Sequence, residues 1–103
     1  MIKIFIEGRK HRTNAKALYN EKTREVTVLK GSVVSETVSE FRHNDSIIHK
    51  RVETCEDGIV KKDIVFPNPT VAAQYVCGYS VSGPVAWHVE KHKNLSEWLK
   101  ERE

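Results

Sequence analysis

Residues 66–87 read FPNPTVAAQYVCGYSVSGPVAW and decide the fold. Asn68 can cap a helix through its side-chain oxygen, and Pro69 suits the first helical position, where no backbone N–H is needed. Gly78 can end that helix in the left-handed conformation. We therefore predict a helix over residues 69–77.

Length and composition describe a single domain spanning residues 1–103. Hydrophobic residues make up 39% of the chain and charged residues 30%, which is typical of an ordinary folded domain. No apolar run approaches the ~20 residues of a membrane helix, and the first residues are too few and too charged for a signal peptide. We expect a cytoplasmic protein, with Cys55 and Cys77 as free thiols because they form no C-x-x-C pair.

Hydrophobic periodicity predicts the other elements. Ile2, Ile4 and Ile6 alternate with Lys3 and Phe5, the period-two pattern of a strand with one buried face. Further expected elements are a hairpin of residues 15–19 and 26–29, a helix over 46–55 with Ile47, Ile48 and Val52 on one face, a second hairpin of 59–60 and 64–66, a strand at 85–89, and a closing helix after a capping box at Asn94 and Glu97. This order predicts an α+β domain in which about three helices pack on a small, mainly antiparallel sheet of two hairpins.

Positive charge concentrates in the first third of the chain. The net charge is +3, but residues 1–30 hold eight Lys or Arg against three acidic residues. The run that contains Arg9, Lys10 and Arg12, with Lys16 beyond it, can meet phosphates, because phosphate neutralisation supplies most non-specific nucleic-acid affinity. The alternative is a solvated loop between two strands.

Patterns of catalytic or metal-binding chemistry are weak. His88 and His92 have a spacing that suits two ligands on a helix, but their context favours strand and loop, and no third ligand is indicated. The serines and histidines lack the context of a nucleophile with its base, and the glycines follow no phosphate-loop spacing. We therefore expect a protein that is not an enzyme, with no metal and no cofactor.

Binding fits the loop at residues 79–84 better. Ser80 and Ser82 offer donors and acceptors without bulk, and Trp87 offers an aromatic face for stacking on a base. Lys91 and Lys93 follow closely and can contact phosphates. The alternative is that Trp87 is a core residue, since large aromatic side chains are more often buried than exposed as platforms.

Several segments together carry a family resemblance. They are VLKGS at 28–32, DIVFPNPTVAA at 63–73, GYSVSG at 78–83, Trp87 and Leu95. In this order they resemble the bacterial family called domain of unknown function 4357 (DUF4357), over roughly residues 19–99. Similar helix and loop signatures occur in the restriction-enzyme and adenine-methylase associated domain.

The resemblance implies a DNA-associated accessory module, because members often lie at the C-terminus of GIY-YIG nuclease-like, methylase or restriction-related proteins. It implies no catalysis. The candidate binding positions that it suggests are Lys30, Gly31, Ser32, Ser80, Ser82, Gly83 and Trp87. We expect binding of nucleic acid, DNA in particular, in a restriction-modification or defence-related setting, with a nuclease or methylase as a possible protein partner. The alternative is a protein-interaction or assembly domain that binds no nucleic acid.

Overall fold

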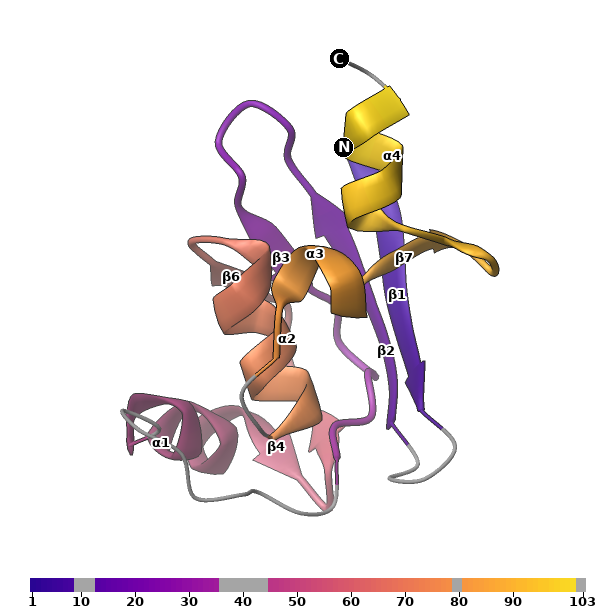
Figure 1. The fold of residues 1–103 in the computed structure, drawn as a ribbon. Helices are drawn as coiled ribbons and strands as arrows, with labels where there is room; N and C mark the ends of the chain where they lie inside the picture. The colour runs from indigo at the N-terminus through magenta and orange to yellow at the C-terminus, as the bar shows by residue number, and fades with distance from the viewer. Residues whose placement is uncertain (9–12, 36–44, 79–80, 102–103) are drawn as a thin grey trace.

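The computed structural model describes residues 1–8, 13–35, 45–78 and 81–101, with the side chains of 45–48 left out (Figure 1). A six-stranded sheet forms its centre, in the order β6-β3-β2-β1-β7-β8, and every neighbouring pair is antiparallel. Its strands are β1 (Ile2–Gly8), β2 (Thr13–Tyr19), β3 (Val26–Val28), β6 (Ile64–Phe66), β7 (His88–Glu90) and β8 (Lys93–Asn94). A separate two-stranded sheet pairs β4 (Cys55–Glu56) with β5 (Ile59–Val60).

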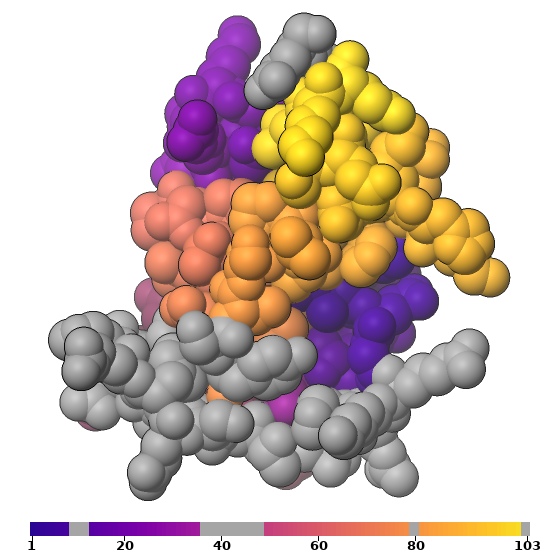
Figure 2. Space-filling view, viewed as in Figure 1, coloured from indigo at the N-terminus to yellow at the C-terminus, as the bar shows by residue number. Residues whose placement is uncertain are grey.

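The described helices are α1 (Asp45–Thr54), α2 (Pro69–Cys77), α3 (Gly83–Ala86) and α4 (Leu95–Glu101). The last three lie on one face of the large sheet, whereas α1 contacts α2 and β4. Figure 1 shows α2, α3 and α4 in front of the strands, and the space-filling view from the same side shows their side chains covering this face (Figure 2). No helix among the described residues is long and apolar enough to cross a membrane.

Alternation along the strands places the core between the sheet and these helices. Ile4 and Ile6 of β1 are buried, as are Ala15 and Ala17 of β2, whereas their neighbours in sequence point to the opposite face. The largest fully buried side chains include Trp87, Tyr75, Ile4 and Leu95. The expected α+β domain with a mainly antiparallel sheet is therefore confirmed.

Helix α2 forms as its sequence predicts. Asn68 Oδ1 accepts the Val71 N–H at 2.9 Å, and Pro69 is the first helical residue. Gly78 has φ 79°, and its N–H donates to the Gln74 carbonyl at 2.9 Å. Both ends of α2 are thus satisfied by the groups that the sequence indicated.

The strand pairs in the second half of the chain differ from the two hairpins that the sequence predicted. Residues 59–60 do not pair with 64–66; they pair with 55–56, and β6 pairs with β3. The physical reason is the turn at Asp57-Gly58, where φ is 54° and 76°, the positive values that a tight two-residue hairpin turn needs. The Asp-Gly pair thus builds a hairpin beyond the helix end.

Two further differences concern helices, of which the described residues form four rather than about three. The strand expected at 85–89 is replaced by α3 and then β7, because Pro84 favours the first turn of a helix. The helix expected over 46–55 is present as α1, shifted by one residue. Val52, expected on its apolar face, is 76% exposed, and the Ile47 and Ile48 side chains lie outside the described residues.

Candidate functional site

Trp87 and Gly83 hold α3 against the start of α2. Trp87 is fully buried, and its indole Nε1–H donates to the Pro69 carbonyl at 3.0 Å. Gly83 packs so closely that a Cβ on it would lie 2.3 Å from Pro69 C and from Thr70 N. The structure therefore places both candidate binding residues in the core, with no aromatic face of Trp87 open to a ligand.

The serine-containing loop is described in part. Ser80 lies outside the described residues. Ser82 is exposed just before α3, and its side chain makes no capping hydrogen bond there. Next to it, the Gly83 N–H donates to Thr70 Oγ1 at 3.3 Å. Ser82 is thus an accessible hydroxyl beside a closely packed backbone.

The Lys30-Gly31-Ser32 segment forms a corner at the end of β3. Ser32 is buried, and its Oγ accepts the Lys16 N–H at 3.0 Å and donates to the Lys16 carbonyl at 3.1 Å. Gly31 turns the chain with φ 90°, and the Lys30 N–H donates to Asp63 Oδ1 at 2.8 Å. The Lys16 carbonyl also accepts the Leu29 N–H at 2.9 Å, so the partner that the Ser32 hydroxyl replaces, beyond the end of β3, is the one for the Lys16 N–H.

The side chain of Lys16 lies on the sheet face that carries no helix, which we call the open face. Its residues on β1 are Lys3, Phe5 and Glu7, which alternate with the buried isoleucines. On β2 the open face continues with exposed Lys16 and half-buried Leu18. The two strands keep register along seven residue pairs, so Phe5 and Lys16 are direct cross-strand neighbours.

Three adjoining hollows follow this face and bring separate lysines together. The first, of about 260 Å³, is lined by Lys16 and Lys30; the second, of about 400 Å³, by Lys3, Phe5 and Lys16. The third, of about 300 Å³, is lined by Phe5, Glu7, His88 and Lys91. We call Lys3, Lys16, Lys30 and Lys91, all exposed, the lysine stripe. Glu7 is the one acidic residue among the described linings of these hollows.

An aromatic pair lies within the stripe. Phe5 and His88 are partners across β1 and β7, and their rings stack with centroids 5.9 Å apart and planes inclined by 27°. The His88 Nδ1–H donates to the Ala86 carbonyl at 3.1 Å, which fixes the orientation of the imidazole. Both residues are half-buried, so part of each ring is accessible from the open face.

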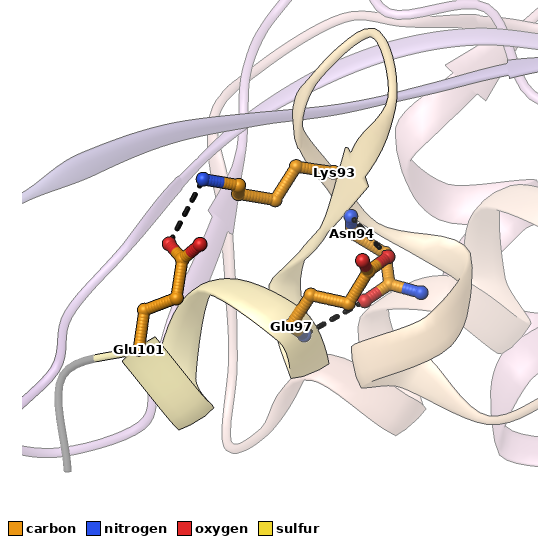
Figure 3. Close-up of polar contacts among 4 residues, drawn as sticks. All are labelled: Lys93, Asn94, Glu97 and Glu101. Atoms are coloured by element: carbon orange, nitrogen blue, oxygen red, sulfur yellow. Dashed lines mark hydrogen bonds and ion pairs between the residues drawn. The ribbon is translucent and has the colours of Figure 1, made fainter.

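Lys93, another candidate binding residue, is held by α4 (Figure 3). Its ammonium lies 2.8 Å from Glu101 Oε2, and this hydrogen bond raises the pKa of Lys93. Asn94 and Glu97 form the predicted capping box, with the Glu97 N–H donating to Asn94 Oδ1 at 2.9 Å. Part of the charge of Lys93 is therefore neutralised within the domain.

The remaining candidate groups are the basic residues at 9–12, possible metal ligands and the two cysteines. Arg9, Lys10 and Arg12 lie outside the described residues. Among the residues that are described, no group of three His, Cys, Asp or Glu side chains could hold a metal ion. Cys55 and Cys77 are both free thiols, as expected.

A buried polar chain links α1 to α2. The Thr54 hydroxyl donates to the Lys50 carbonyl and accepts from the Tyr75 hydroxyl at 2.6 Å, and the Cys55 thiol lies 2.9 Å from the same Tyr75 oxygen. Burial, with the Cys55 hydrogen bond, raises the pKa of Tyr75 well above its ordinary value. Tyr75 thus stays protonated at neutral pH and acts as a structural link.

Arg51 fastens the same C-terminal end of α2 to α1. Its guanidinium donates to the Tyr75 carbonyl at 2.8 Å and to the Val76 carbonyl at 3.2 Å. These belong to the last turn of α2, whose carbonyls have no partner within the helix. Burial lowers the pKa of this arginine, but a guanidinium stays charged at neutral pH.

Comparison with known families gives a match over almost the whole domain. The family model described as Domain of unknown function (DUF4357) matches residues 6–99. The chain belongs to the DUF4357 family. No curated protein and no solved structure matches it.

In this DUF4357 domain, the residues that carried the resemblance and those that form the open-face site are largely different. Lys30 is common to both sets, and Lys16 was expected within the basic N-terminal third. Lys3, Phe5 and His88 were missed. A signal was available for Phe5, because its place in the strand alternation predicts a solvent-facing aromatic.

Proposed function

We propose that this DUF4357 domain is a non-catalytic accessory module that binds nucleic acid, DNA in particular, through the lysine stripe of its open face. The lysine stripe, four exposed lysines with one carboxylate among them, carries this proposal. Among the described residues, none of the four ammonium groups is engaged in an ion pair. Free ammonium groups in a row suit a phosphate backbone, because each phosphate contact releases condensed counterions.

The corner at residues 30–32 positions two members of the lysine stripe. Ser32 Oγ holds both the N–H and the carbonyl of Lys16, and the turn at Gly31 brings Lys30 to the same hollow. Two lysines that are distant in sequence are thus held together by a rigid buried contact. Because the backbone that carries these two lysines is already fixed, less ordering is left to be paid on binding.

A salt-dependent titration tests the proposal. We expect a labelled DNA duplex to bind in fluorescence anisotropy, with affinity falling steeply between about 50 and 200 mM salt. Lys16→Ala and Lys30→Ala should each weaken binding and reduce the slope of log K against log salt by about 1. Lys100→Ala, an exposed lysine on α4 at the opposite face, is the matched control. Absence of binding at low salt, or equal losses in all three variants, would refute the proposal; Ser82→Ala tests the loop separately.

The restriction-modification or defence-related setting, in the cytoplasm, is part of the same proposal. It is supported by the resemblance to domains attached to nucleases and methylases. A nuclease or methylase gene beside this one, and co-purification of its product with the domain, is the expected result. A neighbourhood without any nucleic-acid enzyme would count against the setting while leaving DNA binding to its own test.

A protein-interaction or assembly role is the second candidate. The observation that favours it is Val65, which is 57% exposed on β6, an edge strand of the large sheet. Exposed apolar edge strands are templates for pairing with another chain. Light scattering should then show a dimer, or a pull-down a stable partner, that Val65→Lys abolishes, with no retention on DNA. A monomer that binds DNA would decide against this role.

A further inference from the structure

We propose that the open face selects single-stranded nucleic acid and stacks an unpaired base on the Phe5–His88 pair. This rests on the proposed function and adds the class of nucleic acid to it. Two half-buried rings, stacked 5.9 Å apart, lie inside the lysine stripe rather than beside it. An aromatic surface among cations is the arrangement by which proteins hold single strands.

The register of the sheet gives the arrangement its geometry. Lys16, Phe5 and His88 form one row across β2, β1 and β7, because Phe5 pairs with Lys16 on one side and with His88 on the other. Neighbours in such a row have Cβ atoms about 5 Å apart. Lys91 lines the hollow of about 300 Å³ at the far end of the row. A base stacked on the rings therefore has an ammonium group available on each side for its flanking phosphates.

The rings favour a single strand over a duplex for a physical reason. In a duplex the faces of the bases are covered by their neighbours, so a protein ring has nothing to stack on. Lysines alone would serve either form, since both expose phosphates. The aromatic pair is thus the feature that discriminates between them.

Both rings of the Phe5–His88 pair are held in fixed positions. Its Nδ1–H is committed to the Ala86 carbonyl, so the ring is held in place before any ligand arrives. Phe5 has only two side-chain torsions and is packed against that ring. Rigid aromatic groups lose little conformational entropy on binding, which favours their use as a platform.

The test compares an oligo(dT) probe with a hairpin duplex of equal charge, using Phe5→Leu. We expect Phe5→Leu to weaken oligo(dT) binding about 5- to 150-fold, the equivalent of about 1–3 kcal/mol for one stacked base, and to leave duplex binding nearly unchanged. The salt slope should not change, because no phosphate contact is lost. Phe5→Trp should retain the affinity. Val65→Ala removes an exposed apolar group from the same face and is the matched control.

The outcomes separate this inference from the proposed function. Suppose that Lys16→Ala lowers the affinity for both probes, while Phe5→Leu changes the affinity for neither probe or for both equally. The stacking inference is then overturned, and nucleic-acid binding stands. If neither probe binds at low salt, both fall together. Circular dichroism checks folding of Phe5→Leu, and His88→Ala provides a second variant that should show the same selective loss.

Discussion

Replacing Gly83 with alanine should destabilise the domain, although alanine is the better helix former. Gly83 is the first residue of α3, and its φ lies outside the positive region, so the backbone accepts alanine. The obstacle is space: the new Cβ would lie 2.3 Å from Pro69 C and Thr70 N. Ordinary contact begins at 3.4 Å, so α3 must move away from α2 by about 1 Å.

The magnitude follows from what this movement disturbs. Two hydrogen bonds join the helices, from the Gly83 N–H to Thr70 Oγ1 at 3.3 Å and from Trp87 Nε1 to the Pro69 carbonyl at 3.0 Å. Losing both costs about 0.5–1.5 kcal/mol each. Overpacking adds about 1–3 kcal/mol, and helix propensity returns about 1 kcal/mol. We expect a net loss of about 3 kcal/mol, or a fall in Tm of more than about 10 °C.

Urea unfolding followed by circular dichroism measures this loss, and two other glycines serve as controls. Gly8→Ala places its Cβ 3.5 Å from Thr13 Cβ, an ordinary contact, and should change stability little. Gly31→Ala meets no atom within 4 Å but has φ 90°, so it reports backbone strain alone. A Gly83→Ala variant as stable as the parent, or more stable, would show that α3 is not packed on α2 and would reopen Gly83 as a binding residue.

Three further predictions concern buried polar contacts. Trp87→Ala should lower the free energy of unfolding by about 3–5 kcal/mol, and Trp87→Phe by less; a loss below about 1 kcal/mol for alanine in urea unfolding would contradict a buried indole. Ser32→Ala should cost about 1–3 kcal/mol in the same assay because the Lys16 N–H loses its acceptor, whereas exposed Ser82→Ala should stay within about 0.5 kcal/mol; equal effects would refute the bridging role. The raised pKa of Tyr75 means that the unfolded chain releases this proton first, so its stabilising contribution is present below pH ~10 and is lost as pH rises further. In an ultraviolet titration, the difference between the parent and Tyr75→Phe isolates the Tyr75 phenol. This phenol should ionise at a higher pH than an ordinary tyrosine does.

Local signals predicted the parts of the fold that depend on neighbouring residues. Helix α2 was placed correctly because Asn68, Pro69 and Gly78 act on backbone groups within one turn of themselves. The β1 strand and the capping box at Asn94 were correct for the same reason. In each case the interaction that fixes the structure joins residues that are close in sequence.

Strand partners were predicted less well, since pairing is decided by tertiary contacts. The Asp57-Gly58 dipeptide that follows α1 suits a hairpin turn, and the structure uses it to pair β4 with β5. That pairing leaves β6 free to join β3, far back in the sequence. Phe5 and His88 meet for a similar reason, because only the completed sheet makes β7 the neighbour of β1.

The residues by which this chain resembles its family explain its architecture better than its binding. Ser32, Gly83 and Trp87 each have a buried partner that accounts for them without any ligand. A chain can therefore keep this motif and this fold while changing Phe5 and Lys16, which face solvent and make no comparable demand on the core. Family membership alone then says little about nucleic-acid binding, and the discriminating comparison is between members that keep the open-face aromatic and lysines and members that lack them. If both groups bind DNA equally, the surface responsible must lie elsewhere on the domain.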